Sequence, residues 1–473
     1  MASVTIVGLG PADWETVPHS SRELLTAERP VVVRTLRHPA ATTLAELRAV
    51  IACDDLYESG NDLDGVYTAI ATRVLELAPS DVIYAVPGGP GVGERSVVEI
   101  RKQAERDGTA VSVVLGGSFL EPVLSAAGLD PLERGMQLLD AHSLPDPLLL
   151  HLPTVIGHVD RPRVAAVVKD ALSRVLEPDV EVTVIRDAGS GRETVTAVPL
   201  RELHAADVDE RTTLFLDPPP AGWPGLIAVN RRLRQECPWD REQTHHSLVQ
   251  HLVEEAYEVV DAISALSPTA PAGVSDFGAY AALEEELGDL LLQVVFHATL
   301  ASEVAGFDVE EVAEQIRRKL VRRHPHVFGD ANAPSATEAL GQWDERKRQE
   351  KGRESAMDGV PASLPALMRA LQFQRKAASQ GFDWPDIAGP LDKIAEEAAE
   401  LAAADGPEQR SDELGDLLFS MVNLARHLEI EPELALRHAA DRFAARYRSM
   451  EASGPIAGKS LEELDALWEQ AKG

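Results

Sequence analysis

The sequence predicts two classes of fold in one chain, an α/β region followed by two all-α regions. Before residue 220, short runs of β-branched residues alternate with stretches that have helical periodicity. A segment rich in proline and glycine follows at 217–225, and beyond it the composition changes to Ala, Leu, Glu and Arg with helical periodicity. Alternating strands and helices are typical of a mainly parallel sheet, whereas an uninterrupted helical pattern indicates all-α domains.

Five apolar runs are the candidate strands of the α/β region. They are residues 4–7, 30–33, 82–86, 111–114 and 182–185. Continuous β-branched runs of this length are typical of strands that are buried on both faces. Helical stretches at 66–77 and 94–106 lie between them, so we expect strand–helix–strand connections and a mainly parallel sheet.

Two breaks divide the chain into domains. Three consecutive prolines at 218–220 cannot lie inside a helix or a central strand, so 217–225 is the expected linker. A second segment, 351–365, contains two glycines and two prolines and divides the helical region. The expected organisation is an α/β domain at 1–216, a linker at 217–225, a helical domain at 226–350, a linker at 351–364 and a second helical domain at 365–473.

The charge balance argues against two classes of partner. The 473 residues include 77 Asp and Glu against 45 Lys and Arg, which gives a formal net charge of −32. Nucleic-acid polymers and anionic membranes both favour a cationic binding face, so we expect neither as a partner. The two cysteines, Cys53 and Cys237, belong to no metal-binding or disulfide pattern. With no signal-peptide pattern and no apolar run of about 18 residues, the sequence indicates a cytoplasmic protein.

The two helical regions resemble each other, which indicates a duplication. The first contains acidic motifs at 254–258 and 286–291, and the second contains matching motifs at 396–400 and 413–418. A Trp-x-x-x-Lys pattern follows in each copy, at Trp343 and Lys347 and at Trp468 and Lys472. The main length difference falls between the acidic motifs, where the first copy has a Pro-, Gly- and Ser-containing stretch at 267–278. An insertion confined to a loop is what a tandem repeat tolerates.

The acidic motifs place carboxylates on shared helix faces. Residues three apart lie on one face, so Glu397 pairs with Glu400, and Glu413 pairs with Asp416 on the following helix. The apolar residues around the second motif are expected to be buried: Leu414, Leu417, Leu418 and Phe419. Carboxylates gathered among apolar groups repel one another, and a hard divalent cation compensates them. All-oxygen ligands suit Mg²⁺, with Mn²⁺ as a substitute. A solvated acidic helix face is the alternative, but both motifs occur twice in the same order.

Four further segments accompany the acidic motifs, at 237–244, 322–328, 381–384 and 422–428. With these segments, the region from about 226 to 473 resembles the MazG family of nucleoside triphosphate pyrophosphohydrolases. The resemblance implies all-α domains in two tandem copies and a homodimer formed through the MazG helices. It also implies Mg²⁺-dependent cleavage of nucleoside triphosphates between the α- and β-phosphates, which yields a monophosphate and pyrophosphate.

This chemistry gives the residues of the second copy their expected roles. The Mg²⁺ ligands are Glu397, Glu400, Glu413 and Asp416, and the metal would neutralise the triphosphate, orient the water and stabilise the leaving pyrophosphate. Glu396 is the remaining carboxylate and is the candidate for orienting or deprotonating the attacking water. Lys393, one turn before Glu396, is the second candidate for a catalytic role, because its ammonium could reach a phosphate oxygen. Further candidates for substrate binding are the cations Lys393, Arg442, Arg446 and Lys472 and the indole of Trp468, which would stack on a base.

The first copy has matching acids but differs at one cation. The corresponding metal ligands are Glu255, Glu258, Glu286 and Asp289, with Glu254 in the position of Glu396. His251 stands where the second copy has Lys393, and a histidine that is mostly neutral at pH 7 is a weaker partner for phosphate. Because the second copy is typically the catalytic one in two-copy members of the family, we expect the active site there.

Glycine turns follow three of the candidate strands, beginning at Gly8, Pro87 and Gly116. Ligands of open α/β sheets bind at the carboxyl ends of strands, so three such turns predict one shared crevice. The region from about 3 to 215 resembles the S-adenosylmethionine-dependent tetrapyrrole methylase family, with Ala12 in place of a glycine and Gly89 in place of an acidic residue. The resemblance implies cofactor contacts from Gly8, Gly10, Pro87, Gly88, Gly116 and Ser118. The whole arrangement resembles the YabN-type fusion of a methylase-like domain with MazG.

Three functions are consistent with these features. The leading one is a Mg²⁺-dependent nucleoside triphosphate pyrophosphohydrolase that removes unwanted nucleotides from the pool, because the acidic motifs are complete and doubled. The second is an S-adenosylmethionine-dependent methyltransferase whose MazG half is regulatory, which the glycine turns favour. The third is an assembly module without catalysis, which predicts that changing Glu397 and Glu400 to glutamine has no effect.

Overall fold

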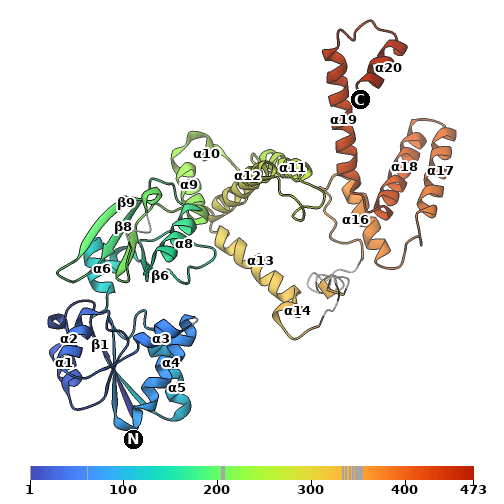
Figure 1. The fold of residues 1–473 in the computed structure, drawn as a ribbon. Helices are drawn as coiled ribbons and strands as arrows, with labels where there is room; N and C mark the ends of the chain where they lie inside the picture. Colours follow the sequence, from blue (N-terminus) through green and yellow to red (C-terminus); the bar gives the residue numbers. More distant parts are fainter. Residues whose placement is uncertain are drawn as a thin grey trace. The chain divides into compact units, whose positions relative to one another are not determined.

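The computed structural model describes residues 2–60, 62–203, 208–332, 335, 338–339, 342–343, 346 and 355–472 (Figure 1). It divides into two compact units, Met1–Val312 and Ala313–Gly473. The first unit contains two β-sheets and the first four helices of the first repeat, and the second unit contains the second repeat. Lys347 and the expected domain boundary at 350–351 lie outside the described residues.

The first sheet has five parallel strands in the order β3-β2-β4-β1-β5. Their bounds are β1 Ser3–Gly8, β2 Val31–Val33, β3 Ile51–Ala52, β4 Val82–Val86 and β5 Ala110–Val114. Four of these correspond to the apolar runs expected at 4–7, 30–33, 82–86 and 111–114, with β2 one residue shorter than its run, so the parallel sheet predicted from them is confirmed. Strand β3 is not predicted from the sequence, because it consists of only two residues that pair with β2 and is too short to form an apolar run.

Helices cover both faces of this sheet, which explains why its strands are apolar throughout. Alternate residues of β4 point to opposite sides: Tyr84 packs with α4 and α5, and Ile83 packs with α1 and α2. The helices are α1 His19–Thr26, α2 Pro39–Leu47, α3 Asp54–Ser59, α4 Leu63–Glu76 and α5 Arg95–Asp107. Tyr84 and Ile83 are fully buried, as expected for a sheet with two covered faces.

A second sheet follows with the order β6-β7-β10-β8-β9. Its strands are β6 Gln137–Asp140, β7 Thr154–Gly157, β8 Glu181–Arg186, β9 Thr194–Pro199 and β10 Thr212–Leu216. Only β6 and β7 pair in parallel, so the expected parallel arrangement is wrong for the run at 182–185. The reason is local: β8 returns through a short turn that contains Gly189 and Gly191, and a short connection joins antiparallel strands.

Three further helices belong to the second sheet region, namely α6 Leu120–Ala127, α7 Pro131–Arg134 and α8 Pro162–Ser173. Helix α8 packs through Ala165, Val168 and Leu172 onto the strands of this sheet. The expected linker at 217–225 is shorter than predicted, because helix α9 begins at Gly222. Pro224 is tolerated there because the first turn of a helix leaves its amide groups without intrahelical partners.

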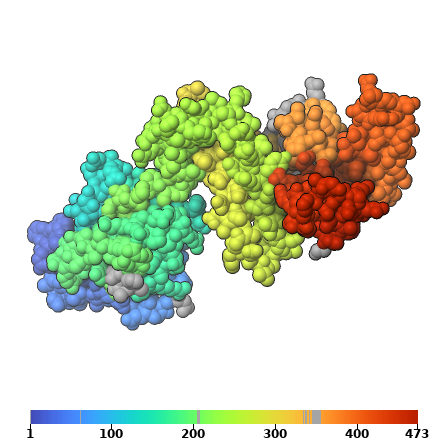
Figure 2. Space-filling view, turned by 90° about the horizontal axis from the view of Figure 1, so that it is seen from above, coloured from blue at the N-terminus to red at the C-terminus, as the bar shows by residue number. Residues whose placement is uncertain are grey.

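The first repeat consists of α9 Gly222–Glu236, α10 Pro238–Glu242, α11 Val249–Ala265, α12 Phe277–Ser302 and α13 Val309–Arg323. Helices α11 and α12 pack against each other, and the insertion expected at 267–278 is the loop that joins them. Helix α14 Pro325–Phe328 also belongs to the first repeat. The second repeat consists of α16 Ala366–Ala378, α17 Ala388–Ala403, α18 Pro407–His427, α19 Pro432–Ala452 and α20 Leu461–Gln470. Helices α17 and α18 form the corresponding pair, and Figure 2 shows α19 and α20 as a dark red surface.

The helical pairs keep much of their apolar surface exposed. Leu414, Leu418 and Phe419 on α18 are 48%, 44% and 46% exposed, so the expectation that they are buried is wrong. Within the described residues the facing helix α17 does not cover them. Among the helices that the structure describes, none is both long enough and apolar enough to cross a membrane.

Candidate functional site

The second acidic cluster lies where α17 faces α18. Glu397 and Glu400 are one turn apart on α17, and Glu413 lies in the second turn of α18. Each of the three offers a carboxylate oxygen within 4.8 Å of the others. Glu397 is buried, Glu413 is half-buried and Glu400 is exposed, so the cluster opens to solvent at one side. Asp416 lies one turn beyond Glu413 and acts on it electrostatically without joining this group of three.

Lys393 supplies the cation of this cluster. Its Nζ lies 2.6 Å from Glu397 Oε1 and 2.9 Å from Glu396 Oε1. Hydrogen bonds to Glu397 and Glu396 hold the pKa of Lys393 above its ordinary value, so its ammonium stays charged. The structure therefore brings the two residues expected to have catalytic roles, Lys393 and Glu396, into direct contact beside the carboxylates.

Charge repulsion persists despite Lys393. Partial burial, followed by the carboxylates of Glu400, Glu397 and Asp416, raises the pKa of Glu413 above its ordinary value. A carboxyl whose ionised form is disfavoured by neighbours of like charge gains from a bound cation. The donor set is entirely carboxylate oxygen, which fits Mg²⁺ or Mn²⁺.

The first repeat has an equivalent cluster on α11 and α12. Glu255, Glu286 and Asp289 each offer an oxygen within 4.8 Å of the others. Partial burial raises the pKa of Glu255 and of Glu286, with Glu258 as a further cause for both. Glu258 therefore contacts the cluster from one turn further along α11.

The cation differs between the copies as the sequence indicates. His251 Nδ1 lies 3.3 Å from a carboxylate oxygen of Glu254, the counterpart of Glu396. The ring of His251 also contacts the indole of Trp239, with centroids 6.0 Å apart. The helix-interior glycines of the two motifs, Gly288 and Gly415, have open space where a Cβ would lie. No contact inside the described chain therefore accounts for them.

The remaining candidates for substrate binding lie on α19 and after it. The Trp468 ring packs against Phe443, with centroids 5.1 Å apart, and the Arg446 guanidinium lies 5.7 Å from the centre of the same ring. Lys472 pairs with Glu469 one turn earlier. Arg442 lies on the exposed surface of α19. Their role in substrate binding stays a prediction.

The glycine turns of the first sheet meet as expected. A Cβ on Gly8 would lie 2.6 Å from the carbonyl oxygen of Gly88, and one on Gly116 would lie 2.6 Å from the carbonyl oxygen of Gly8. Gly10, at φ 73°, exchanges backbone hydrogen bonds with Gly88. Ser118 Oγ accepts a hydrogen bond from the Leu120 amide. These glycines thus allow close approach of three backbone segments, which is a structural reason for them beside the expected cofactor role.

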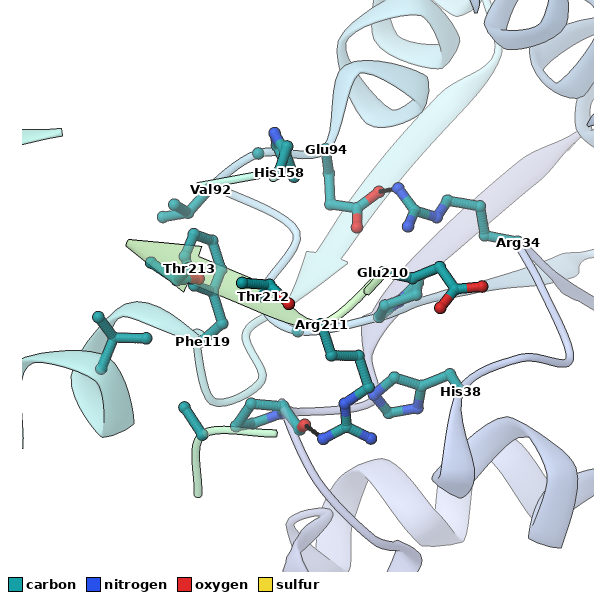
Figure 3. A pocket seen from close by; sticks show the side chains of 16 residues that line it. Arg34, His38, Val92, Glu94, Phe119, His158, Glu210, Arg211, Thr212 and Thr213 are labelled. Carbon is teal, nitrogen blue, oxygen red and sulfur yellow. Dashed lines mark hydrogen bonds and ion pairs between the residues drawn. The ribbon is translucent and has the colours of Figure 1, made fainter. Parts of the chain in front are cut away.

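A cavity of about 140 Å³ lies beside these turns (Figure 3). Pro87 and Gly88 line it, together with an apolar wall that includes Phe119 and Val123. The polar part of its lining comes from residues that the sequence analysis missed: Arg34, His38, Glu94, His158 and Arg211. They come from loops without a distinctive spacing, so no sequence pattern marks them.

The polar part of the lining of this cavity is charged and largely buried. Arg34 Nη1 donates to Glu94 Oε2 at 3.1 Å, and burial raises the pKa of Glu94. Burial, followed by the charges of Arg211 and Arg34, lowers the pKa of His38 to about 4, so this imidazole is neutral at pH 7. A cavity lined by both apolar and charged side chains suits an amphipathic small molecule.

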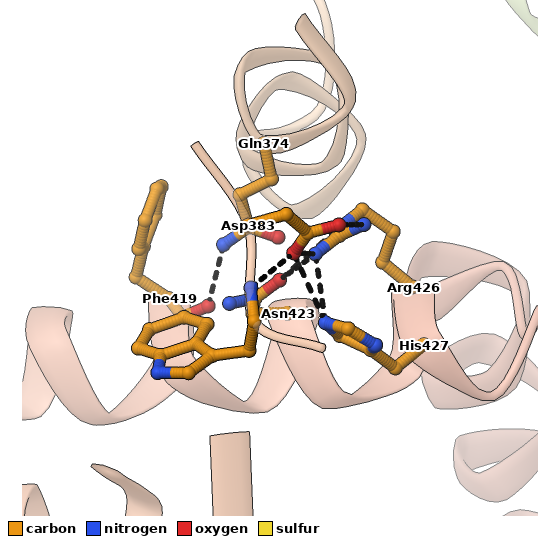
Figure 4. Close-up of polar contacts among 7 residues, drawn as sticks. Gln374, Asp383, Phe419, Asn423, Arg426 and His427 are labelled. Atoms are coloured by element: carbon orange, nitrogen blue, oxygen red, sulfur yellow. Dashed lines mark hydrogen bonds and ion pairs between the residues drawn. The ribbon is translucent and has the colours of Figure 1, made fainter. Parts of the chain in front are cut away.

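A second feature that sequence reasoning missed is a polar network in the second repeat (Figure 4). Arg426 of α18 donates to Asp383 at 2.9 Å and to Asn423 Oδ1, and His427 Nε2 lies 3.2 Å from Asp383. Asp383 also accepts from the backbone amide of Trp384 at 2.9 Å. The two segments that supply these residues, 381–384 and 422–428, carried the family resemblance, but their sequences do not indicate that they contact each other.

Two family models match the chain. The model of the tetrapyrrole (corrin/porphyrin) methylases matches residues 3–204, and the model of the MazG nucleotide pyrophosphohydrolase domain matches residues 243–328. The uncharacterized protein YabN of Bacillus subtilis is 36% identical over 494 aligned residues, which cover 99% of this chain and 98% of that protein. The chain belongs to the MazG family. Its fusion to an N-terminal methylase-like domain is thereby confirmed, whereas the MazG model covers only the first of the two repeats.

Other MazG relatives match the helical half. The nucleoside triphosphate pyrophosphohydrolase/pyrophosphatase MazG of Thermotoga maritima is 43% identical over 52% of this chain and 94% of its own length. The nucleoside triphosphate pyrophosphohydrolase of Escherichia coli K12 is 41% identical over 52% of this chain and 95% of its own length. Among solved structures, a uroporphyrin-III C-methyltransferase of Thermus thermophilus complexed with S-adenosyl homocysteine is 22% identical, with a TM-score of 0.35, over 45% of this chain and 96% of that chain.

Proposed function

We propose that the chain is a nucleoside triphosphate pyrophosphohydrolase that cleaves between the α- and β-phosphates and depends on Mg²⁺, with Mn²⁺ as a substitute. The observation that carries the proposal is the pair of carboxylate clusters, each with three acids within 4.8 Å of one another on two facing helices. Membership of the MazG family supports it, as do the Thermotoga and Escherichia relatives, which are named as nucleoside triphosphate pyrophosphohydrolases.

In the second repeat the proposed Mg²⁺ ligands are Glu397, Glu400, Glu413 and Asp416. The bound metal would supply charge neutralisation for the triphosphate and its pyrophosphate leaving group. Lys393 would donate from its charged ammonium to a phosphate oxygen, which releases Glu396 from their present ion pair. Glu396 would then accept a proton from the attacking water, since a partly exposed glutamate is a competent base when it lies beside the reacting atoms.

The first repeat is proposed as a second metal site with weaker catalysis. Its ligands are Glu255, Glu258, Glu286 and Asp289, but His251 replaces the lysine. Its imidazole pairs with Glu254, and a histidine, which is mostly neutral at pH 7, offers less positive charge to a phosphate than Lys393 does.

We further propose that two copies of the chain associate through the MazG helices. The support is the apolar surface left open beside each cluster, which includes Leu287 and Leu291 on α12 and Leu414 and Leu418 on α18. Contiguous exposed apolar surface of this kind marks interaction sites. For the methylase-like domain we propose S-adenosylmethionine as the ligand of the cavity beside Pro87 and Gly88, which the family match supports.

The test is a panel of ribo- and deoxyribonucleoside triphosphates with chromatographic separation of products. Monophosphate and pyrophosphate are the expected products, and release of orthophosphate with a diphosphate would reject the proposal. Two triple variants locate the activity: Glu397→Gln, Glu400→Gln and Glu413→Gln in the second repeat, and Glu255→Gln, Glu286→Gln and Asp289→Asn in the first. We expect the variant of the second repeat to lose most turnover and the variant of the first repeat to keep it. Calorimetry with S-adenosylmethionine tests the N-terminal ligand separately.

A further inference from the structure

A tryptophan packs beside the acidic helix in both repeats. A Cβ on Gly389 would overlap with Cδ1 of Trp384, so this indole rests directly on the backbone of the first turn of α17. In the first repeat the Trp239 ring contacts His251 of α11. Both side chains remain about half exposed, at 43% for Trp384 and 54% for Trp239. Each ring is therefore placed on a helix while it still presents surface to solvent.

Both contacts lie on the same helix stripe as the carboxylates. In α17, Gly389, Lys393 and Glu397 are spaced by four residues, and residues four apart lie on one face. His251 and Glu255 have the same spacing in α11. At 1.5 Å per residue, the Trp384 contact lies about 12 Å along the helix from Glu397. A nucleotide whose phosphates lie against the acids would place its base at a distance of this order.

The backbone that carries Trp384 is fixed by the polar network of Figure 4. Its amide donates to Asp383, and Asp383 is held in turn by Arg426 and His427 of α18. The Arg426 side chain is 13% exposed and that of Asp383 is 28% exposed, so this support is shielded from water. In the first repeat Gln243 donates to the carbonyl oxygen of Trp239 at 3.0 Å. The tryptophans thus project from anchored segments.

We propose that Trp384, and Trp239 in the first repeat, are the surfaces on which the base of the substrate stacks while its phosphates lie against the carboxylates. An indole offers a flat π surface that any base can use, so the contact adds affinity for a nucleoside with little selection between bases. The inference rests on the nucleotide substrate of the proposed function, but it does not require hydrolysis. It assigns a base contact to residues beside the acids, separate from Trp468 on α20.

The test is calorimetric titration of the full-length protein with Mg²⁺ and two probes, the nonhydrolysable α,β-methylene ATP and inorganic tripolyphosphate. The variants are Trp384→Leu, Trp239→Leu and their combination, because leucine keeps an apolar side chain without a π surface. Phe382→Leu is the matched control, since Phe382 is 82% exposed and lies two residues from Trp384. We expect the nucleotide affinity of the altered site to fall about 5- to 150-fold. Tripolyphosphate binding and the control variant should stay at wild-type affinity.

Gly389→Ala tests the placement of the ring without removing it. The new Cβ displaces the indole from α17, whereas alanine favours the helix itself. We expect the same loss for the nucleotide only, with no loss of thermal stability. The proposal is overturned if the leucine variants bind both probes as the wild type does, or weaken both equally, which would indicate a structural role. If the wild type binds the nucleotide more tightly than tripolyphosphate but hydrolyses nothing, the proposed function fails and the stacking contact stands.

Discussion

The carboxylate cluster of the second repeat should make the stability of its unit depend on Mg²⁺. Glu397, Glu400 and Glu413 converge within 4.8 Å, so a cation that binds them binds the folded state and not the unfolded chain. At one hundred times its dissociation constant, such a ligand stabilises the folded state by about 2.7 kcal/mol. For the unit Ala313–Gly473, of this size class, each kcal/mol corresponds to roughly 2–4 °C, so Mg²⁺ should raise its Tm by about 5–10 °C.

The perturbation is the triple glutamine variant, which keeps side-chain shape and removes the charges. Without Mg²⁺ its Tm should stay close to that of the wild type, because the lost ion pair of Glu397 with Lys393 is offset by relief of the repulsion around Glu413. With Mg²⁺ the variant should show no upward shift. Differential scanning calorimetry in EDTA and in Mg²⁺ measures both, and the triple variant of the first repeat is the matched control. A wild-type Mg²⁺ shift in the second-repeat variant would refute the reasoning.

Three further predictions use other contacts. The raised pKa values of Glu413, Glu286 and Glu255 contribute stability below about pH 4.5, and this stability is lost as the pH rises through the raised pKa values. The Mg²⁺-dependent Tm shift should therefore grow between pH 5 and 7.5, and equal shifts at both pH values would contradict this. Lys393→Met should reduce pyrophosphate release at least tenfold, while the Mg²⁺ affinity measured by calorimetry is kept or tightened. Lys393→Arg should restore part of the activity, and unchanged turnover in Lys393→Met would count against a catalytic role of Lys393. Gly116→Ala should destabilise the α/β domain by about 1–3 kcal/mol in urea unfolding, because the new Cβ would meet the Gly8 carbonyl. Hydrolysis by the second repeat should continue, and an unchanged unfolding midpoint would disprove the packing argument.

Local pattern was sufficient for the first sheet and insufficient for the second. The run at 82–86 is apolar throughout because helices cover both of its faces, so periodicity alone identifies it as a central parallel strand. The run at 182–185 is apolar in the same way, but its pairing depends on the turn that follows it and on β10, which begins 27 residues after the run ends. Pairing over such a separation has no signal in the strand itself.

The site shows the same division. Helical spacing within one element placed Glu397 beside Glu400, and duplication of the motifs indicated that the facing helix completes the cluster. Neither spacing nor duplication could show that Lys393 bridges two of the acids, or that Leu414 and Leu418 would be left exposed, since both depend on side-chain packing between elements. The contact of Asp383 with Arg426 joins residues 43 positions apart, which no local pattern reports.

The two clusters belong to separate compact units, so the chain has two related sites and one can be lost while the other is kept. A substitution that unfolds Ala313–Gly473 leaves the other site on helices that still pack with each other and with α9. With two sites, one can diverge in sequence while the other is preserved. His251, at the position that corresponds to Lys393, is a difference of this kind. If both clusters bind Mg²⁺ as proposed, loss of one cluster should leave one metal site in each chain.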